Sequence, residues 1–399
     1  MASTKVYIVN DSEVKLWGLS GGERIHRQLR KLGETHVIEN IEAAEDGDLI
    51  LLLRGDFYFD PRILSAATGL QKNSCISLGQ SGPVVALMVD GADALENAAE
   101  LNDQQAGFSG YNMLFPGDMV EAYDPRLLKY DPPVILPITE DSVNSLEREI
   151  FDGSYKGVTD FVTKWLWPLP SRHAVKFCVN RGFTANQVTL LSYVLAILTG
   201  LAFWHGFFVV GLLSGWFMTF LDTVDGKLAR VTVTSSKIGD VLDHGLDLVH
   251  PPLWYLAWGI GIQDSVMGHS TVMIFFWVIL AAYIGGRLCE GAFDLWLAPF
   301  RLFLWRPVDS MNRLVTARRN PNMVLLTLSL IPGRPDIGLY MVVFWHCLST
   351  LILSARLITA ARQKAEHGQL ESWFDSVDPE KDLHRLEVRM FTRLAKSRS

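Results

Sequence analysis

Cysteine is scarce in this sequence of 399 residues, and no two cysteines stand close together. The four are Cys75, Cys178, Cys289 and Cys347. Without a CxxC pair the chain lacks the spacing of a zinc ribbon, and scattered thiols make a poor disulfide framework. We expect these cysteines to be small apolar side chains in the interior.

An excess of positive charge is also missing, since 36 Lys and Arg face 43 Asp and Glu, a formal net charge of −7. This balance disfavours a nucleic-acid-binding protein. The N-terminal stretch MASTKVYIVNDSEVKLWG has no apolar run after a basic start, so we expect no cleavable signal peptide. The first domain is therefore expected in the cytoplasm.

Long apolar runs dominate the chain from about residue 186 to 361. A bilayer core about 30 Å thick needs about 20 mainly apolar residues of helix. This predicts six membrane helices, at about 187–205, 207–226, 241–262, 271–295, 322–333 with its flanks, and 337–360. Lys and Arg gather before the first of these, between the second and third, after the fourth and after the last. Basic loops stay on the cytoplasmic side, so the sequence predicts a multi-pass integral membrane protein with both termini cytoplasmic.

Four aspartates stand inside this apolar half, in DTVDGKLARVTVTSSKIGDVLDHGLD. Asp222 and Asp225 are three residues apart, and Asp243 and Asp247 are four apart, so each pair shares one helix face. Carboxylates at membrane depth are costly without a partner. Converging carboxylates suit hard divalent cations, which prefer oxygen ligands, and two such ions can clamp a phosphate. Helix capping and ion pairing at the interface are the alternative for any single aspartate.

These residues resemble a family motif. The pattern D-x2-D-G-x2-A-R-x8-G-x3-D-x3-D of the CDP-alcohol phosphotransferases is matched at every fixed position and gap by the following residues. They are Asp222, Asp225, Gly226, Ala229, Arg230, Gly239, Asp243 and Asp247. The resemblance implies a six-helix membrane enzyme that transfers a substituted phosphate from a CDP-linked alcohol to a hydroxyl and releases CMP.

The resemblance also assigns roles. It implies that Asp222, Asp225, Asp243 and Asp247 hold two Mg²⁺ or Mn²⁺ ions, with Asp247 also the general base. It implies that Gly226, Ala229, Arg230 and Gly239 form the site for the cytidine and its pyrophosphate. Thr184, Ala185 and Asn186 stand where the family commonly has Thr-Pro-Asn. Asn186 is therefore a further candidate for the nucleotide site, with helix capping as the alternative. By analogy with the family we expect a homodimer.

The substrates are less clear from the sequence. Arg287, Arg318 and Arg319 are candidates to hold an acceptor phosphate, as in enzymes that act on inositol phosphate. The alternatives are plain cytoplasmic charge for Arg318 and Arg319, and an internal ion pair with Glu290 and Asp294 for Arg287. The first interpretation is CDP-diacylglycerol or a CDP-polyol as donor and a polyol phosphate as acceptor, in phospholipid synthesis. A CDP-aminoalcohol phosphotransferase is an alternative, and an ion-coupled transporter is one from another class, although the repeated halves common in transporters are not evident.

The rest of the chain divides around this part. Residues 1–145 alternate short apolar runs with helical patterns, which predicts a cytosolic α/β domain with a mostly parallel sheet. LLLRGDFYFDPRIL resembles a sugar-phosphate nucleotidyltransferase strand, with Asp56 in the metal position, although the family's Gly-rich loop is not at the end of the first strand. Asp56 and Asp60 could equally stabilise a turn. We expect an amphipathic basic linker at 146–186, the membrane domain at 187–362, and a polar tail at 363–399 with a surface helix.

Overall fold

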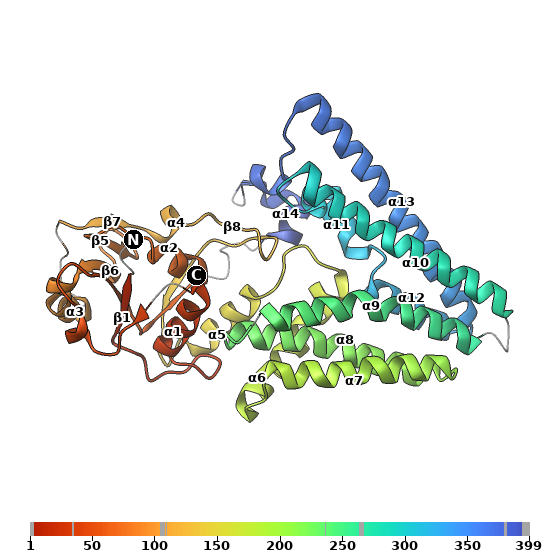
Figure 1. Cartoon of the computed structure of the whole chain (residues 1–399), viewed down its shortest axis with the longest axis horizontal. Helices are drawn as coiled ribbons and strands as arrows, with labels where there is room; N and C mark the ends of the chain where they lie inside the picture. The colour runs from red at the N-terminus through yellow and green to blue at the C-terminus, as the bar shows by residue number, and fades with distance from the viewer. Residues whose placement is uncertain are drawn as a thin grey trace. The chain divides into compact units, whose positions relative to one another are not determined.

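The computed structural model describes residues 4–33, 36–103, 108, 110–235, 237–262, 267–378 and 381–392 (Figure 1). For residues 237–244, 246 and 247 it describes the backbone alone. The chain divides into two compact units. One contains residues 1–124, 131–154 and 230–234, and the other contains 125–130, 155–229 and 235–399.

A six-stranded sheet forms the centre of the N-terminal unit. Its order is β2 (His36–Val37), β1 (Lys5–Val9), β3 (Leu49–Arg54), β6 (Val84–Asp90), β5 (Ser74–Ser77) and β7 (Asn112–Leu114). Three of the five strand pairings are parallel, as predicted for most of the sheet, and two are antiparallel, because β6 runs antiparallel to both β3 and β5. A short connection through residues 78–83 joins β5 directly to β6, and so tight a turn can only reverse the strand direction. The predicted α/β class is confirmed.

Helices cover both faces of this sheet. Along β3, Leu51 and Leu53 pack with side chains of α1 (Gly21–Leu32) and α2 (Pro61–Ala67). Ile50 and Leu52 pack on the other face, with α3 (Ala94–Asn102). The continuous apolar run LILLLR is thus buried on both faces, as expected for a central strand. The unit also contains β4 (Phe57–Phe59), β10 (Ile135–Pro137), β8 (Tyr123–Asp124), α4 (Pro116–Met119) and α5 (Val143–Gly153).

The second unit is helical. Its elements are β9 (Lys129–Tyr130), α6 (Pro168–Arg181), α7 (Ala185–Trp204), α8 (Phe208–Val231), α9 (Lys237–Ile262), α10 (His269–Ala292), α11 (Pro307–Val315), α12 (Arg319–Leu330), α13 (Pro335–His367) and α14 (Leu386–Phe391). Helices lie at all six positions where membrane spans were predicted.

Four helices in the described part of the chain are long and apolar enough to cross a membrane, which is consistent with a multi-pass integral membrane protein. They are α7, α8, α10 with its extension to Leu297, and α13. The other two predicted spans differ for physical reasons. The first half of α9 carries Lys237, Asp240, Asp243 and Asp247, which lower its mean hydropathy. The 12 residues of α12 extend about 18 Å, well short of the bilayer core.

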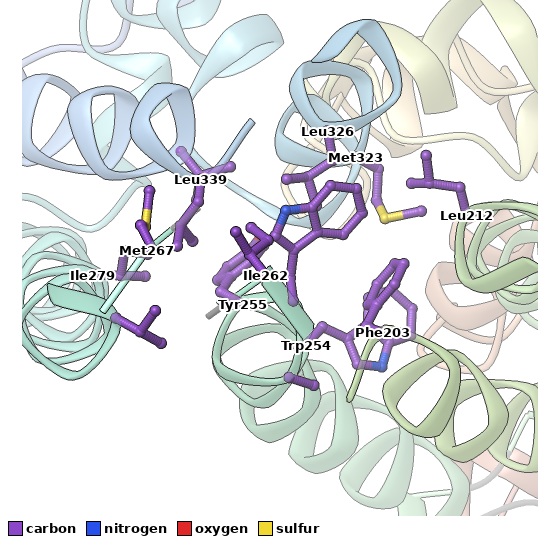
Figure 2. Packing of buried hydrophobic residues seen from close by; sticks show 14 of the residues in the cluster. Phe203, Leu212, Trp254, Tyr255, Ile262, Met267, Ile279, Met323, Leu326 and Leu339 are labelled. Atoms are coloured by element: carbon purple, nitrogen blue, oxygen red, sulfur yellow. The ribbon is translucent and has the colours of Figure 1, made fainter. Parts of the chain in front are cut away.

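The core of the helical unit joins α7, α8, α9, α10, α12 and α13 around aromatic side chains (Figure 2). Phe203 of α7 lies against Trp254 and Trp258 of α9. The helices approach closely here, because a Cβ on Gly261 would lie 2.1 Å from the Phe203 carbonyl oxygen. Small residues at such crossings are typical of helix packing in membranes.

The predicted linker contains α6, which buries Ser171, Val175 and Cys178 on one side. Apolar side chains at Trp165, Leu166, Leu169 and Phe177 remain exposed near the basic residues Arg172 and Lys176. The placement of this segment at a membrane surface stays a prediction.

Candidate active site

The first two aspartates of the motif lie on α8, near its C-terminal end. Asp225 is 5% exposed and Asp222 is half-buried. Thr189 of α7 donates a hydrogen bond from its hydroxyl to the Asp225 carboxylate, at 2.6 Å between the oxygens. A partner across two helices limits the orientations that this carboxylate can adopt.

The start of α7 fixes where Thr189 lies. Thr184 caps the helix and forms a reciprocal pair of hydrogen bonds with Gln187, so the first turn begins at a defined residue. Thr189 then stands just over one turn inside the helix. Asn186 is exposed in the first turn, and its role at a nucleotide site stays a prediction.

The remaining motif residues are only partly described. Asp243, Asp247 and Gly239 belong to α9, but their side-chain environments lie outside the described residues. Gly226 and Ala229 are half-buried and Arg230 is exposed, all on the last turns of α8. Among the described residues, no three acidic, histidine or cysteine side chains meet as a metal site requires. Asp222 and Asp225 supply hard oxygen donors on one helix face, a donor set that fits a divalent cation.

Arg319, a predicted acceptor residue, lies at the motif itself. It is the first residue of α12, and its Nη2 atom is 2.5 Å from the Asp222 carboxylate. The pair is mostly shielded, with 13% and 16% of the two side chains exposed. The structure thus brings a basic side chain from residue 319 to an acidic one from residue 222.

The other two predicted acceptor residues meet at a small cavity. Arg287 and Glu290 come from α10, and Arg318 precedes α12. Arg318 donates a hydrogen bond to the Glu290 carboxylate, while Nη1 of Arg287 is 3.8 Å from it. The predicted ion pair of Arg287 with Glu290 is therefore present, although Asp294 pairs with Arg301 instead, at 2.7 Å. Tyr283, His346, Ser349 and Thr350 also line the cavity.

Positive charge exceeds negative charge around this cavity. The guanidinium groups of Arg313 and Arg318 lie 5.6 and 5.8 Å from the centre of the Phe303 ring. Burial, and then the neighbouring Arg318, lower the pKa of Arg313 to about 9. Arg313 lies in the basic stretch after the fourth predicted membrane helix, and its distance from Arg287 along the chain hides their proximity.

A buried aspartate holds the start of α12 in place. Asn320 donates a hydrogen bond to Asp160, at 3.0 Å, and Asp160 also accepts one from the Thr163 amide, at 3.0 Å. Burial by itself would raise the pKa of Asp160, but Arg313 and these hydrogen bonds together hold the pKa below its ordinary value. This anchor fixes the residue that follows Arg318 and Arg319, so it restricts where both arginines lie.

The C-terminal segment packs against the residues around Phe303. Trp373 donates a hydrogen bond from its indole nitrogen to Ser310, at 2.9 Å, and Ser310 donates one to the Phe303 carbonyl oxygen, at 2.7 Å. Trp373, Phe374 and Phe391 are buried, while Leu386 at the start of α14 is exposed. The predicted polar tail is thus folded onto the helical unit over part of its length.

Comparison with known proteins now gives the family. Residues 183–304 match the CDP-alcohol phosphatidyltransferase family. This part of the chain belongs to that family. The matched residues run from the start of α7 past the end of α10, and include the whole aspartate motif.

Individual relatives of the family are similar over shorter stretches. The chain is 27% identical over 149 residues to the bifunctional IPC transferase and DIPP synthase of Thermococcus kodakarensis, covering 33% of this chain and 34% of that protein. It is 40% identical over 86 residues to choline/ethanolaminephosphotransferase 2 of Arabidopsis thaliana, covering 22% of this chain and 21% of that protein. The matches therefore span about a third or less of the relatives' own length.

Proposed function

We propose that the helical unit transfers a substituted phosphate group from a CDP-linked alcohol to the hydroxyl of a phosphate-bearing acceptor and releases CMP. Family membership of residues 183–304 supports the reaction class. The observation that carries the choice of acceptor is the cavity lined by Arg287 and Arg318 with only Glu290 between them. Guanidinium groups bind phosphate oxygens by charge-assisted hydrogen bonds.

In this proposal the reaction is a single displacement. The acceptor hydroxyl oxygen bonds to the β-phosphorus, and the bond from that phosphorus to the bridging oxygen breaks, so CMP leaves with that oxygen. Asp247 takes the hydroxyl proton, and Gly226, Ala229, Arg230, Gly239 and Asn186 bind the cytidine and pyrophosphate. Asp222, Asp225, Asp243 and Asp247 would hold two Mg²⁺ or Mn²⁺ ions, which when bound neutralise the charge on the pyrophosphate.

The described side chains have supporting tasks in this scheme. The Thr189 hydroxyl keeps the Asp225 carboxylate in one orientation. Arg319, at the start of α12, places positive charge beside Asp222 of the motif. Arg287 and Arg318 orient the acceptor through its phosphate, and Arg313 adds charge behind them.

The same proposal includes the donor and the arrangement of the protein in the membrane. The donor is CDP-diacylglycerol or a CDP-polyol, in phospholipid synthesis at the membrane. All six helices contribute to the membrane domain, both termini are cytoplasmic, α6 lies on the inner leaflet, and the protein is a homodimer.

A CDP-aminoalcohol phosphotransferase is the second candidate. The similarity to choline/ethanolaminephosphotransferase 2 favours it, at 40% identity over 86 residues. Such a reaction would join an aminoalcohol phosphate to an acceptor without a phosphate, and would leave the arginine cavity without a task.

Release of CMP tests the proposal. Purified protein in detergent is given CDP-diacylglycerol, a CDP-polyol or a CDP-aminoalcohol with Mg²⁺ or Mn²⁺, each with a polyol phosphate, the same polyol without phosphate, or diacylglycerol. We expect metal-dependent release with a phosphate-bearing acceptor, reduced by Asp225→Asn about a hundredfold or more, because a lost metal ligand removes several kcal/mol of transition-state stabilisation.

Asp336→Asn is the matched control. Asp336 also lies in the helical unit, at the start of α13, and is paired with Arg334 at 2.6 Å. It should retain activity. Unchanged release in Asp225→Asn would contradict the proposed site, and release only with a CDP-aminoalcohol and diacylglycerol would favour the second candidate.

A further inference from the structure

One edge of the sheet in the N-terminal unit corresponds to a common nucleotide-binding position in α/β folds. Strands β1 and β3 are parallel neighbours, and their carboxyl ends meet at one edge of the sheet, where α/β folds commonly bind ligands. The connection from β1 to α1, residues 10–20, and the turn after β3, residues 55–56, both lie there. A nucleoside triphosphate with its metal would need open space, free amides and a free carboxylate at this edge.

The space is filled by the chain itself. Leu16 and Trp17 of the β1–α1 connection are 0% and 2% exposed. The Trp17 amide donates a hydrogen bond to the Glu147 carboxylate at 2.9 Å, and its indole nitrogen donates one to the Glu147 carbonyl oxygen at 3.0 Å. The second half of the connection is therefore packed in the core and tied to α5, whereas Asp11, Glu13 and Lys15 in its first half are exposed.

The amides at the start of α1 are also occupied. Asp11 accepts a hydrogen bond from the Gly22 amide at 2.6 Å and one from the Ser20 hydroxyl at 2.7 Å. The Ser20 hydroxyl accepts a hydrogen bond from the Glu23 amide, and the Glu23 carboxylate accepts one from the Ser20 amide. A phosphate at a helix N-terminus binds to such amides, so here the Asp11 carboxylate stands where a phosphate would, with the same sign of charge.

Close packing leaves no gap between these segments. A Cβ on Gly21 would lie 1.9 Å from the Gly55 carbonyl oxygen, so the start of α1 is pressed against the end of β3. Arg24 of α1 is 2% exposed and donates to the Leu16 carbonyl oxygen at 2.8 Å. This hydrogen bond ties its guanidinium to the connection.

Asp56, which the resemblance placed at a metal, has a cation already. Arg54 Nε and Nη2 contact its two carboxylate oxygens at 2.9 and 2.5 Å, and Asn10 donates a hydrogen bond at 3.2 Å. Arg54 is 1% exposed and lies over the Phe57 ring, at 4.7 Å from its centre, so it is held in place. A bidentate arginine neutralises the carboxylate that a metal would otherwise balance.

We infer that the N-terminal unit does not bind a metal–nucleoside triphosphate, so the CDP-linked donor must come from a separate cytidylyl-transfer reaction. In that reaction a phosphate oxygen of the alcohol phosphate bonds to the α-phosphorus of CTP, the bond from that phosphorus to the bridging oxygen breaks, and pyrophosphate leaves. The need for a separate source of the CDP-linked donor rests on the proposed function. The absence of a triphosphate site rests on the N-terminal residues alone.

Equilibrium dialysis of labelled CTP with Mn²⁺ against the full-length protein tests the inference. Arg230→Ala removes the guanidinium assigned to the cytidine diphosphate beside the aspartate motif, so any binding left in that variant reports other sites. We expect saturable binding to fall at least tenfold in Arg230→Ala, and the remainder to be the same after adding Asp56→Asn or, separately, Asp11→Asn.

Saturable binding that survives Arg230→Ala and is lost with Asp56→Asn or Asp11→Asn would overturn the inference. Two conservative variants are used so that misfolding of one does not decide the result. CMP release by the wild-type protein from a supplied CDP-alcohol is measured in parallel. Its failure would count against the proposed function, whereas the CTP-binding result would still decide whether the N-terminal unit holds a triphosphate.

Discussion

Arg54 of the N-terminal unit and the arginines at the cavity of the helical unit differ in how their charge is matched. In the N-terminal unit, Arg54 is matched to Asp56 by two contacts, so this cation is balanced within the fold. In the helical unit, Arg287 and Arg318 share Glu290 beside a cavity, with Arg313 close by. A matched ion pair indicates a structural role, whereas excess charge beside a cavity indicates a ligand of opposite sign.

The largest effect is expected from removing an arginine at the cavity of the helical unit. Arg318→Ala should raise the KM for a phosphate-bearing acceptor by about a hundredfold, since hydrogen bonds to charged groups contribute about 1.5–3 kcal/mol. The KM for the CDP-linked donor should change little. Initial rates of CMP release at varied acceptor and donor concentrations measure both values.

Arg301→Ala is the matched control, because Arg301 pairs with Asp294 and 67% of its side chain is exposed. It should leave both KM values unchanged. An equal rise in the donor KM for Arg318→Ala would mean that the arginine is not specific to the acceptor.

Removing the matched arginine of the N-terminal unit should affect stability and not turnover. Arg54→Met leaves Asp56 without its arginine and should destabilise the N-terminal unit by about 2 kcal/mol. Hydrogen exchange of the β3 amides, read by mass spectrometry, reports on that unit. CMP release should be unchanged, and Lys72→Met, which removes an exposed partner of Asp90, should hardly change the exchange. A loss of CMP release in Arg54→Met would show that the two units are not separable in this way.

A smaller effect is expected at the anchor of α12. Asp160→Asn should lower the free energy of unfolding of the helical unit by about 1.5 kcal/mol at neutral pH, because Arg313 and Asn320 lose a charged partner. The thermal unfolding midpoint in detergent measures it.

The same variant should alter the pH dependence. The pKa of folded Asp160 lies below the ordinary value of 3.8, so its stabilisation is complete above that value and is lost as the pH falls through the folded value. The gap between the wild-type and variant midpoints should therefore narrow in strong acid. A gap that is constant with pH would argue against a charged Asp160.

The smallest effect concerns Thr189. Thr189→Val removes the hydroxyl that orients Asp225 while keeping the shape, and should lower kcat about fivefold, the equivalent of one hydrogen bond of about 1 kcal/mol. Thr189→Ser should restore most of the rate. Equal rates in the valine and wild-type proteins would show that the hydroxyl does not position the carboxylate.

Much of this arrangement could be predicted from local spacing. The aspartate motif and the apolar helices depend on residues close in sequence, as does the α/β pattern of the N-terminal unit. The antiparallel direction of β6 could not be predicted, because strand direction depends on the connection between β5 and β6 and not on the strands' own composition.

The supporting residues could not be found in this way. Thr189 and Asp225 are 36 residues apart, and Asp160 and Asn320 are 160 apart, so only the folded chain joins them. A polar threonine inside an apolar helix was the one available signal for the first pair. Nothing in the sequence around Trp373 indicated that it would be buried against Ser310.

One measurement tests the central claim most directly. The initial rate of CMP release is compared between a polyol phosphate and the same polyol without phosphate, at saturating CDP-linked donor, in the wild-type protein and in Arg318→Ala. The account predicts a strong preference for the phosphate-bearing acceptor that largely disappears in the variant. Equal wild-type rates with the two acceptors, or a preference unaffected by Arg318→Ala, would contradict it.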